Sequence, residues 1–525
     1  MHGTELVLIS LLVAVAGLAT LARAINVPYP ILLVVGGLVM GFIPGLPAVS
    51  LEPDLVLVIF LPPLLYSAAF FANLQELRAN ARPISLMAIG LVIATMCVVA
   101  VVAHAMIDGI PWAAAFALGA IVAPTDPLAA TTVARRLGVP RRIVSVIEGE
   151  SLVNDGTALV AYRVAVTAAV GGGFSIWSAG LKFVLGAAGG VLIGLAAGWI
   201  VSEIRRRLDD VPVEITISLL SGYAAYLPAE AVGASGVLAA VTAGLVLGWR
   251  APQISTARMR LQGSAVWETL IFLLNAFLFV LIGLQLPMIL DRLSGHPAGT
   301  LALQAAVASL AVIATRLVWA NTVVFLIRAL DRRPQQRARR TSWRVRMISA
   351  WSGMRGAVSL AAALALPADF PERDLILFLT FAVIFATLVL QGLTLPVLIR
   401  RLHVEDDGAD AREDLLARRA AVDAALARLD DLREQDWTRD DTADRMHAMY
   451  EYRRRRFAAR AGEGGVDDDD EDIEHRSRKY QKMVRAVLDA QRAELVRLRN
   501  SGQISNDVMH RLEREFDLED DRLEI

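Results

Sequence analysis

Residues 143–169, IVSVIEGESLVNDGTALVAYRVAVTAA, are long enough for one helix across a bilayer, yet they carry carboxyl groups at Glu150 and Asp155. A bilayer core about 30 Å thick needs roughly 20 apolar residues per helix. Ionisable side chains near its centre are costly, so one that is retained there indicates a function. This stretch therefore predicts a membrane-spanning helix with candidate functional carboxylates.

The whole chain has the composition of an all-α polytopic membrane protein. Hydrophobic residues make up 55% of the 525 positions and the mean hydropathy is +0.50, with the apolar residues in long charge-poor runs. Residues 1–400 carry 28 basic and 20 acidic side chains, whereas residues 401–525 carry 24 and 33. We therefore expect a transmembrane domain over 1–400 and a cytosolic, mostly helical regulatory domain over 401–525.

The apolar runs predict about thirteen spans. The first run has no preceding Lys or Arg and begins near Glu5, so we interpret it as a span and not as a secretory signal. The expected spans are 4–22, 28–46, 52–72, 83–105, 112–134, 143–169, 178–202, 213–231, 234–249, 265–290, 301–328, 346–366 and 373–399.

Basic residues support this count because they gather in alternate loops, and cytoplasmic loops are the ones enriched in Lys and Arg. The N-terminus is then outside, and the tail from Arg400 onward is cytoplasmic. Only three lysines occur against 49 arginines, a bias typical of GC-rich bacterial genomes, so we expect the plasma (inner) membrane. The basic loops contain Arg23, then Arg78 and Arg82, then Arg135 to Arg142, then Arg205 to Arg207, then Arg250 to Arg260, then Arg328 to Arg346.

Two helix pairs recur about 230 residues apart, at the spans near 112 and 143 and at those near 346 and 373. We therefore expect six spans, a linker helix and six inverted spans. The first helix of each pair is interrupted, by prolines on either side of Asp126 and by glycines on either side of Arg355. Broken helices at matching places in two halves indicate the binding site of a transporter.

Polar side chains near these breaks are suited to a small cation. On a helix, Glu150 lies over Asn154 and Ser151 lies over Asp155, which gives one polar face. Carboxylate, amide and hydroxyl oxygens are hard ligands for a small hard cation. The ionisable members expected in this cluster are Asp126, Glu150, Asp155, Arg355 and Arg316.

The broken helix adds Thr125 and Asp126, with backbone carbonyls freed by the prolines. Burial raises the pKa of a carboxyl group, so such a group can hold a proton at neutral pH and release it when a cation arrives. Competition for one site then couples the two fluxes. For Glu150 we expect a structural role instead, as the ion-pair partner of Arg355.

Three motifs stand at the breaks and on the polar helix: Ala123-Pro-Thr-Asp-Pro127, Glu148-Gly-Glu-Ser-Leu-Val-Asn-Asp-Gly156 and Ser352-Gly-Met-Arg-Gly-Ala-Val358. They resemble the motifs of the monovalent cation/proton antiporters, in the branch of sodium/proton exchangers with an Asn-Asp pair (NhaP-like). The resemblance covers about residues 5–400. It implies a thirteen-helix inverted-repeat fold, a homodimer and alternating access.

The resemblance also implies roles for the site residues. Asp155, beside Asn154, would carry cation and proton, and Na⁺ would be held at Asp155 and Asp126. Thr125 and Ser151 would line the site, and Glu150 would pair with Arg355.

Residues 61–67 resemble the third-helix motif of the same family, but Ser67 stands where several relatives have an acidic residue. The extra carboxylate is missing here, which leaves the cation open. Arg316 and Ser67 are supporting site residues in this interpretation. For Asn275 and Arg163 we expect snorkelling or contacts between helices.

Several alternatives stay open. Oxygen ligands alone do not fix ion size, so the cation is sodium, lithium or potassium. A channel would show filter residues and a pore helix, and a receptor would show a signalling domain after residue 401; we find neither pattern. The seven histidines do not cluster and no nucleophile has a base, so we expect no enzyme, no cofactor and no nucleic-acid partner. Because Asn154 cannot carry a second proton, we expect electroneutral exchange.

Overall fold

The computed structural model describes residues 2–25, 27–43, 53–171, 176–330, 342–404, 408–460, 469–501 and 503–523. Within these ranges all regular structure is helical and no strand occurs, which confirms the all-α prediction. The chain divides into two compact units, Met1–Asp406 and Asp407–Ile525.

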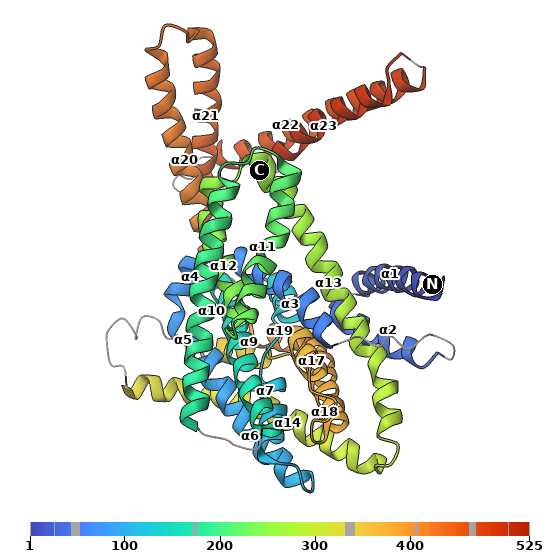
Figure 1. The fold of residues 1–525 in the computed structure, drawn as a ribbon. Coiled ribbons are helices and arrows are strands. Elements are labelled where there is room, and N and C mark those ends of the chain that lie inside the picture. The colour runs from blue at the N-terminus through green and yellow to red at the C-terminus, as the bar shows by residue number, and fades with distance from the viewer. Residues whose placement is uncertain are drawn as a thin grey trace. The chain divides into compact units, whose positions relative to one another are not determined.

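Every expected span overlaps a helix of the first unit (Figure 1). The helices in chain order are α1 (His2–Ala24), α2 (Tyr29–Gly41), α3 (Pro53–Phe70), α4 (Leu74–Ala79), α5 (Ala81–Ser85), the π-helix η1 (Leu86–Gly90), α6 (Leu91–Met106), α7 (Trp112–Val122), α8 (Leu128–Arg136), α9 (Arg141–Val170), α10 (Ile176–Arg205), α11 (Val211–Ala231), α12 (Gly236–Ile254), α13 (Ala257–Arg292), α14 (Ala298–Leu330), α16 (Trp343–Trp351), α17 (Ala357–Leu364), α18 (Arg373–Ala386), the π-helix η2 (Thr387–Gln391) and α19 (Gly392–Leu402).

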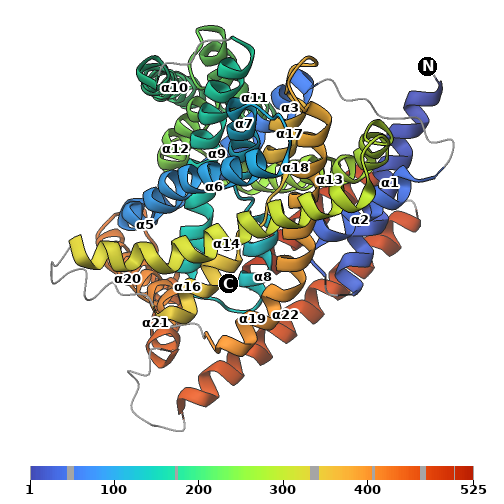
Figure 2. The same cartoon turned by 90° about the horizontal axis from the view of Figure 1, so that it is seen from below.

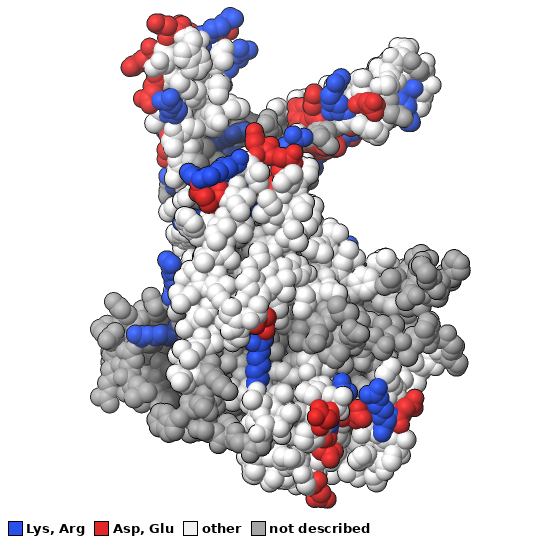
Figure 3. All heavy atoms as spheres, in the orientation of Figure 1, with Lys and Arg blue, Asp and Glu red and all other residues white. Residues whose placement is uncertain are grey.

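Six helical stretches of the described residues are long and apolar enough to cross a membrane, and four shorter helices are also apolar. On the face drawn in Figure 3, uncharged side chains cover a broad area of the first unit and charged ones are sparse. A lipid environment accounts for both features, because apolar side chains facing lipid need no cover. The number of thirteen crossings and the inverted repeat stay predictions.

Both expected helix breaks are present. The chain leaves the helical conformation between α7 and α8, over residues 123–127, and again between α16 and α17, over residues 352–356. The two breaks touch, since the backbone N–H of Asp126 donates to the carbonyl of Met354 at 2.8 Å. Polar backbone of both breaks is thus brought to one buried place.

The helices of the first unit form two groups by their contacts. In one group α10, α11 and α12 contact one another, and α11 and α12 contact α3. In the other group α6 contacts α7 and α14, and α7 contacts α9. Figure 2 shows α13 beside α2. These two helices approach closely because a side chain at Gly37 would overlap the carbonyl of Val280, and one at Gly283 the carbonyl of Val34.

The second unit consists of two helical hairpins. Helices α20 (Ala409–Arg433) and α21 (Asp440–Arg460) contact each other around a small apolar core that includes Leu426 and Phe457. Helices α22 (Asp469–Asn500) and α23 (Asn506–Leu523) are joined by ion pairs from Arg492 to Asp517 and Asp520.

The second hairpin begins in an acidic stretch of the tail. Within the acidic run 467–472, α22 begins at Asp469. Acidic residues are favourable in the first turn of a helix because its N-terminus carries partial positive charge.

Candidate functional site

A cavity of about 310 Å³ lies where the two breaks meet α9. Its walls come from α3, the α7–α8 break, α8, α9, α13 and the start of α17. Five of the expected site residues line it together: Asp155, Asp126, Thr125, Ser151 and Ser67. The cavity is therefore the place at which the sequence motifs converge.

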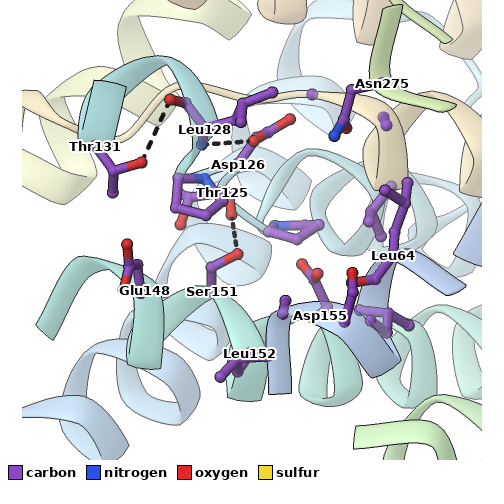
Figure 4. A pocket seen from close by; sticks show the side chains of 18 of the residues that line it. Leu64, Thr125, Asp126, Leu128, Thr131, Glu148, Ser151, Leu152, Asp155 and Asn275 are labelled. Carbon is purple, nitrogen blue, oxygen red and sulfur yellow. Dashed lines mark hydrogen bonds between the residues drawn. The ribbon is translucent and has the colours of Figure 1, made fainter. Parts of the chain in front are cut away.

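Asp155 presents a carboxylate to this cavity from α9 (Figure 4). The side chain is buried, with 6% of the residue exposed, and no described Lys, Arg or His side chain forms an ion pair with it. Asp126 lies on the opposite wall, where its Oδ1 accepts a hydrogen bond from the backbone N–H of Leu128 at 2.9 Å. Two carboxylates thus face one small space, and neither forms an ion pair with a described basic side chain.

Thr125 fastens the first break to α9 through three hydrogen bonds. The hydroxyl of Ser151 donates to its carbonyl at 2.9 Å, and Nδ2 of Asn154 donates to its Oγ1 at 2.8 Å. Its own hydroxyl donates to Glu150 Oε1 at 3.4 Å. Asn154 therefore positions the break beside Asp155 and does not line the cavity itself.

The predicted ion pair between Glu150 and Arg355 is wrong: the partner of Glu150 is Arg316 of α14. The two guanidinium nitrogens Nη1 and Nη2 of Arg316 each donate to one oxygen of the Glu150 carboxylate, the second at 2.9 Å. Arg316 also donates to the carbonyls of Ala350 and Ser349. Both charged side chains are almost fully buried, with 0% and 1% exposure, so this pair locks α9 to α14 and to the end of α16.

Arg355 is also fully buried, but it bonds to backbone. Its Nε donates to the carbonyl of Val122 at 3.0 Å, and its Nη1 donates to the carbonyl of Gly353. Val122 is the last residue of α7, and the C-terminal end of a helix carries partial negative charge. Arg355, which lies in the second break, therefore stabilises the first break.

The model of the transmembrane sodium/hydrogen exchanger family matches residues 8–401. An uncharacterized Na⁺/H⁺ exchanger of Mycobacterium tuberculosis is 37% identical over 98% of this chain and 96% of its own length. The chain belongs to the sodium/hydrogen exchanger family. It is therefore a multi-pass membrane protein of a cation/proton antiporter family.

Two further comparisons agree with this membership. A sodium, potassium, lithium and rubidium/H⁺ antiporter of Bacillus pumilus is 35% identical over 71% of the exchanger and 58% of its own length. The solved structure of the sodium proton antiporter MjNhaP1 from Methanocaldococcus jannaschii has a TM-score of 0.59 at 20% identity, covering 77% of this exchanger and 99% of that chain. The fold is thus that of a solved antiporter.

Several polar residues of the exchanger's cavity were missed as site residues. Among them, Asn275 of α13 and Ser359 of α17 both line it. Ser359 follows directly on the motif that ends at Val358, and its hydroxyl has no hydrogen-bond partner among the described residues. A polar residue in an apolar span was the available signal for Asn275, but its partner helix could not be read from the sequence.

The glycines of the second break have a role beyond interrupting the helix. A side chain at Gly353 would overlap the guanidinium of Arg316, and one at Gly356 would overlap the carboxylate of Asp126. Both positions therefore require glycine because charged side chains occupy the space. The motif around Arg355 makes room for two other members of the cluster.

Proposed function

We propose that this exchanger moves a sodium ion, or another small monovalent cation, in exchange for one proton, with Asp155 binding each in turn. The observation that carries the proposal is the position of Asp155: a buried carboxylate that faces a polar cavity and has no ion-pair partner among the described residues. A carboxylate in such a place needs a proton or a cation to offset its charge. Binding of one then displaces the other.

The balance of buried charges supports exchange of one ion for one proton. Glu150 and Arg316 neutralise each other in direct contact. Among the remaining charged groups of the cluster, Arg355 contributes one positive charge, and Asp126 and Asp155 contribute two negative charges. One bound proton or one monovalent cation brings the sum to zero, so both loaded forms carry the same charge. Electroneutral exchange follows.

The oxygen ligands proposed for the cation are the carboxylates of Asp155 and Asp126, with the hydroxyls of Ser151 and Ser67 and the backbone around Thr125. These are hard ligands, which suit Na⁺ and Li⁺ and also admit K⁺. The name of the Bacillus relative includes all three of these cations. We propose Na⁺ as the main cation, with potassium/proton exchange as the second candidate.

Alternating access is supported by an asymmetry along α9. The cavity extends to Arg135 and Glu148, at the end of the helix that the basic loops predict to be cytoplasmic. No residue of α9 beyond Asp155 lines the cavity, and Gly156 lies against Leu238 of α12. We propose that this is an inward-facing form and that the two helix groups move past each other to expose Asp155 outside.

A polar contact joins the two groups on the closed side. Arg163 of α9 donates to both oxygens of Glu230 of α11, at 2.6 and 2.7 Å, and Glu230 also accepts from the N–H of Gly236 at the start of α12. Arg163 lies eight residues after Asp155, or about 12 Å along the helix. In the proposal this pair breaks when the outer side opens.

The setting follows from the distribution of charge and from the resemblance to exchangers. We propose residence in the plasma (inner) membrane with the N-terminus outside, assembly as a homodimer, and a cytosolic regulatory role for residues 401–525. The acidic balance of the tail supports an aqueous location for it.

Transport in proteoliposomes tests the proposal. Purified protein is reconstituted with a pH-sensitive dye inside, a pH gradient is imposed, and Na⁺, Li⁺ or K⁺ is added outside. We expect cation-dependent dissipation of the gradient, fastest with Na⁺ or Li⁺. No response to any of the three cations would contradict the exchange function, and a response to K⁺ alone would select the second candidate.

A further inference from the structure

We infer that Asn275 of α13 is a ligand of the transported cation and sets the preference among monovalent cations. The inference rests on the proposed function, because it assigns a further ligand to the same cavity. Asn275 lies on the wall opposite Asp155 (Figure 4). No charge accompanies it, so it adds an oxygen without changing the charge balance.

The orientation of the Asn275 amide is fixed by chemistry. Its side chain bonds to the carbonyl of Ile271, one turn earlier on α13, at 2.9 Å. A carbonyl accepts only, so the atom that faces it must be the amide nitrogen. The amide oxygen, Oδ1, is therefore directed away from the helix backbone and stays available as an acceptor.

Comparison with Asn154 shows why Asn275 is the suitable ligand. Asn154 also donates through its nitrogen, but its Oδ1 is sealed from any solvent and the residue does not line the cavity. Asn275 does line the cavity, and its oxygen is not among the sealed atoms. Only the second asparagine can reach a bound ion.

The position of Asn275 gives it a second property. Asp155 and Ser151 come from α9, whereas Asn275 comes from α13, which contacts α2 and α3 on the other side of the cavity. On α3, Ser67 supplies a hydroxyl that already donates to the carbonyl of Leu64 at 2.9 Å. Asn275 thus supplies an uncharged oxygen from the wall opposite α9.

The test compares Asn275→Ala with Asn321→Ala in proteoliposomes. Asn321 of α14 makes the same bond to a carbonyl one turn earlier, at 2.8 Å, but it does not line the cavity. We expect Asn275→Ala to raise the KM for Na⁺ about tenfold, as loss of one polar contact to an ion predicts, and to change the ratio of the KM values for Na⁺ and Li⁺. The maximal rate and the melting temperature should match those of Asn321→Ala.

A second variant tests the inference even if Asn275→Ala fails to fold. Asn275→Asp keeps the size of the side chain and adds a carboxylate, so we expect a lower KM for Na⁺ and a new dependence of the exchange rate on membrane potential. If both Asn275 variants keep the parental cation preference and voltage response, Asn275 is structural and the inference is overturned. Failure of the parent protein to exchange any cation would contradict the proposed function instead.

Discussion

Glu150 and Asp155 lie five residues apart on α9, both buried and both acidic, yet their surroundings differ. Glu150 faces α14, where the guanidinium of Arg316 binds both of its oxygens. Asp155 faces a cavity and has no such partner among the described residues. One helix thus carries one carboxylate that is paired with an arginine and one that, in the proposal, is balanced by a transported ion.

The difference teaches that the direction of a side chain around the helix decides its role, more than its depth. Residues five apart point about 140° away from each other at 3.6 residues per turn. The stripe of Glu150 and Asn154 holds the broken helices in place, while the stripe of Ser151 and Asp155 faces the cavity. In the proposal, structural contacts and transport are thereby divided between two sides of α9.

The largest expected effect comes from removing the transporting carboxylate. Asp155→Asn should insert and fold but lose exchange entirely, because the amide neither attracts a cation nor takes up a proton. The loss of exchange is measured as proton flux in proteoliposomes with a pH-sensitive dye. The matched control is Asp291→Asn, at an exposed position near the end of α13. Sodium-dependent flux close to that of the control would contradict the role of Asp155.

The second effect concerns the balanced carboxylate and should appear as lost stability. Arg316→Ala leaves Glu150 buried without its counter-ion, which costs about 3–5 kcal/mol. We expect a large drop in melting temperature and in yield of folded protein. Asp155→Asn, in contrast, should melt near the parent.

The Arg355→Ala variant tests the same assignment of Arg316 as the partner of Glu150. Arg355 bonds to carbonyls and not to a carboxylate, so its removal should cost less, about 1–3 kcal/mol for the acceptors left unpaired. Thermal melts of the two arginine variants in one detergent compare them directly. A larger loss for Arg355→Ala would show that it, and not Arg316, carries the balance of Glu150.

The sequence predicted much of the fold because membrane spans depend on local composition. The helix breaks around Asp126 and Arg355 could also be predicted from the sequence, because proline and glycine affect the backbone at their own positions. The ion-pair partner of Glu150 could not be predicted, because Arg316 and Arg355 are both arginines in distant spans. Choosing between them requires knowing how α14 and α16 pack against α9.

The same limit applies to the cavity. Ser151 and Asp155 were found by their spacing on one helix, which is a local property. Asn275 and Ser359 join them only through tertiary packing. The glycines at 353 and 356 looked like helix breakers, whereas their lack of a side chain also makes room for Arg316 and Asp126.

A moderate effect is expected at the closed end of α9. Arg163 and Glu230 are partly exposed, so their pair contributes about 1 kcal/mol or less to stability. In the proposal it favours the inward-facing form, so Arg163→Glu should alter the transport rate and the double variant with Glu230→Arg should partly restore it. Rates of the two single variants and the double variant decide this. If the double variant restores none of the rate, the ion pair does not stabilise the inward-facing form.

The smallest effect on transport chemistry is expected from the tail. Truncation after about residue 405 removes α20 to α23 and leaves the cavity residues in place. We expect a membrane-inserted exchanger with an altered rate or pH response. Membrane fractionation and proteoliposome flux measure both properties, and failure to insert would show that the tail is required for folding.

The central claim, that one unbalanced carboxylate changes its partner in each cycle, is tested most directly by the voltage dependence of exchange. Proteoliposomes are clamped with potassium and valinomycin at several membrane potentials, and the rate and end point of sodium/proton exchange are recorded. We predict that both are independent of voltage, because the site carries the same charge with a proton or with a cation. A driving force that shifts by about 2.3 kcal/mol per elementary charge for each 100 mV would show net charge movement and contradict the claim.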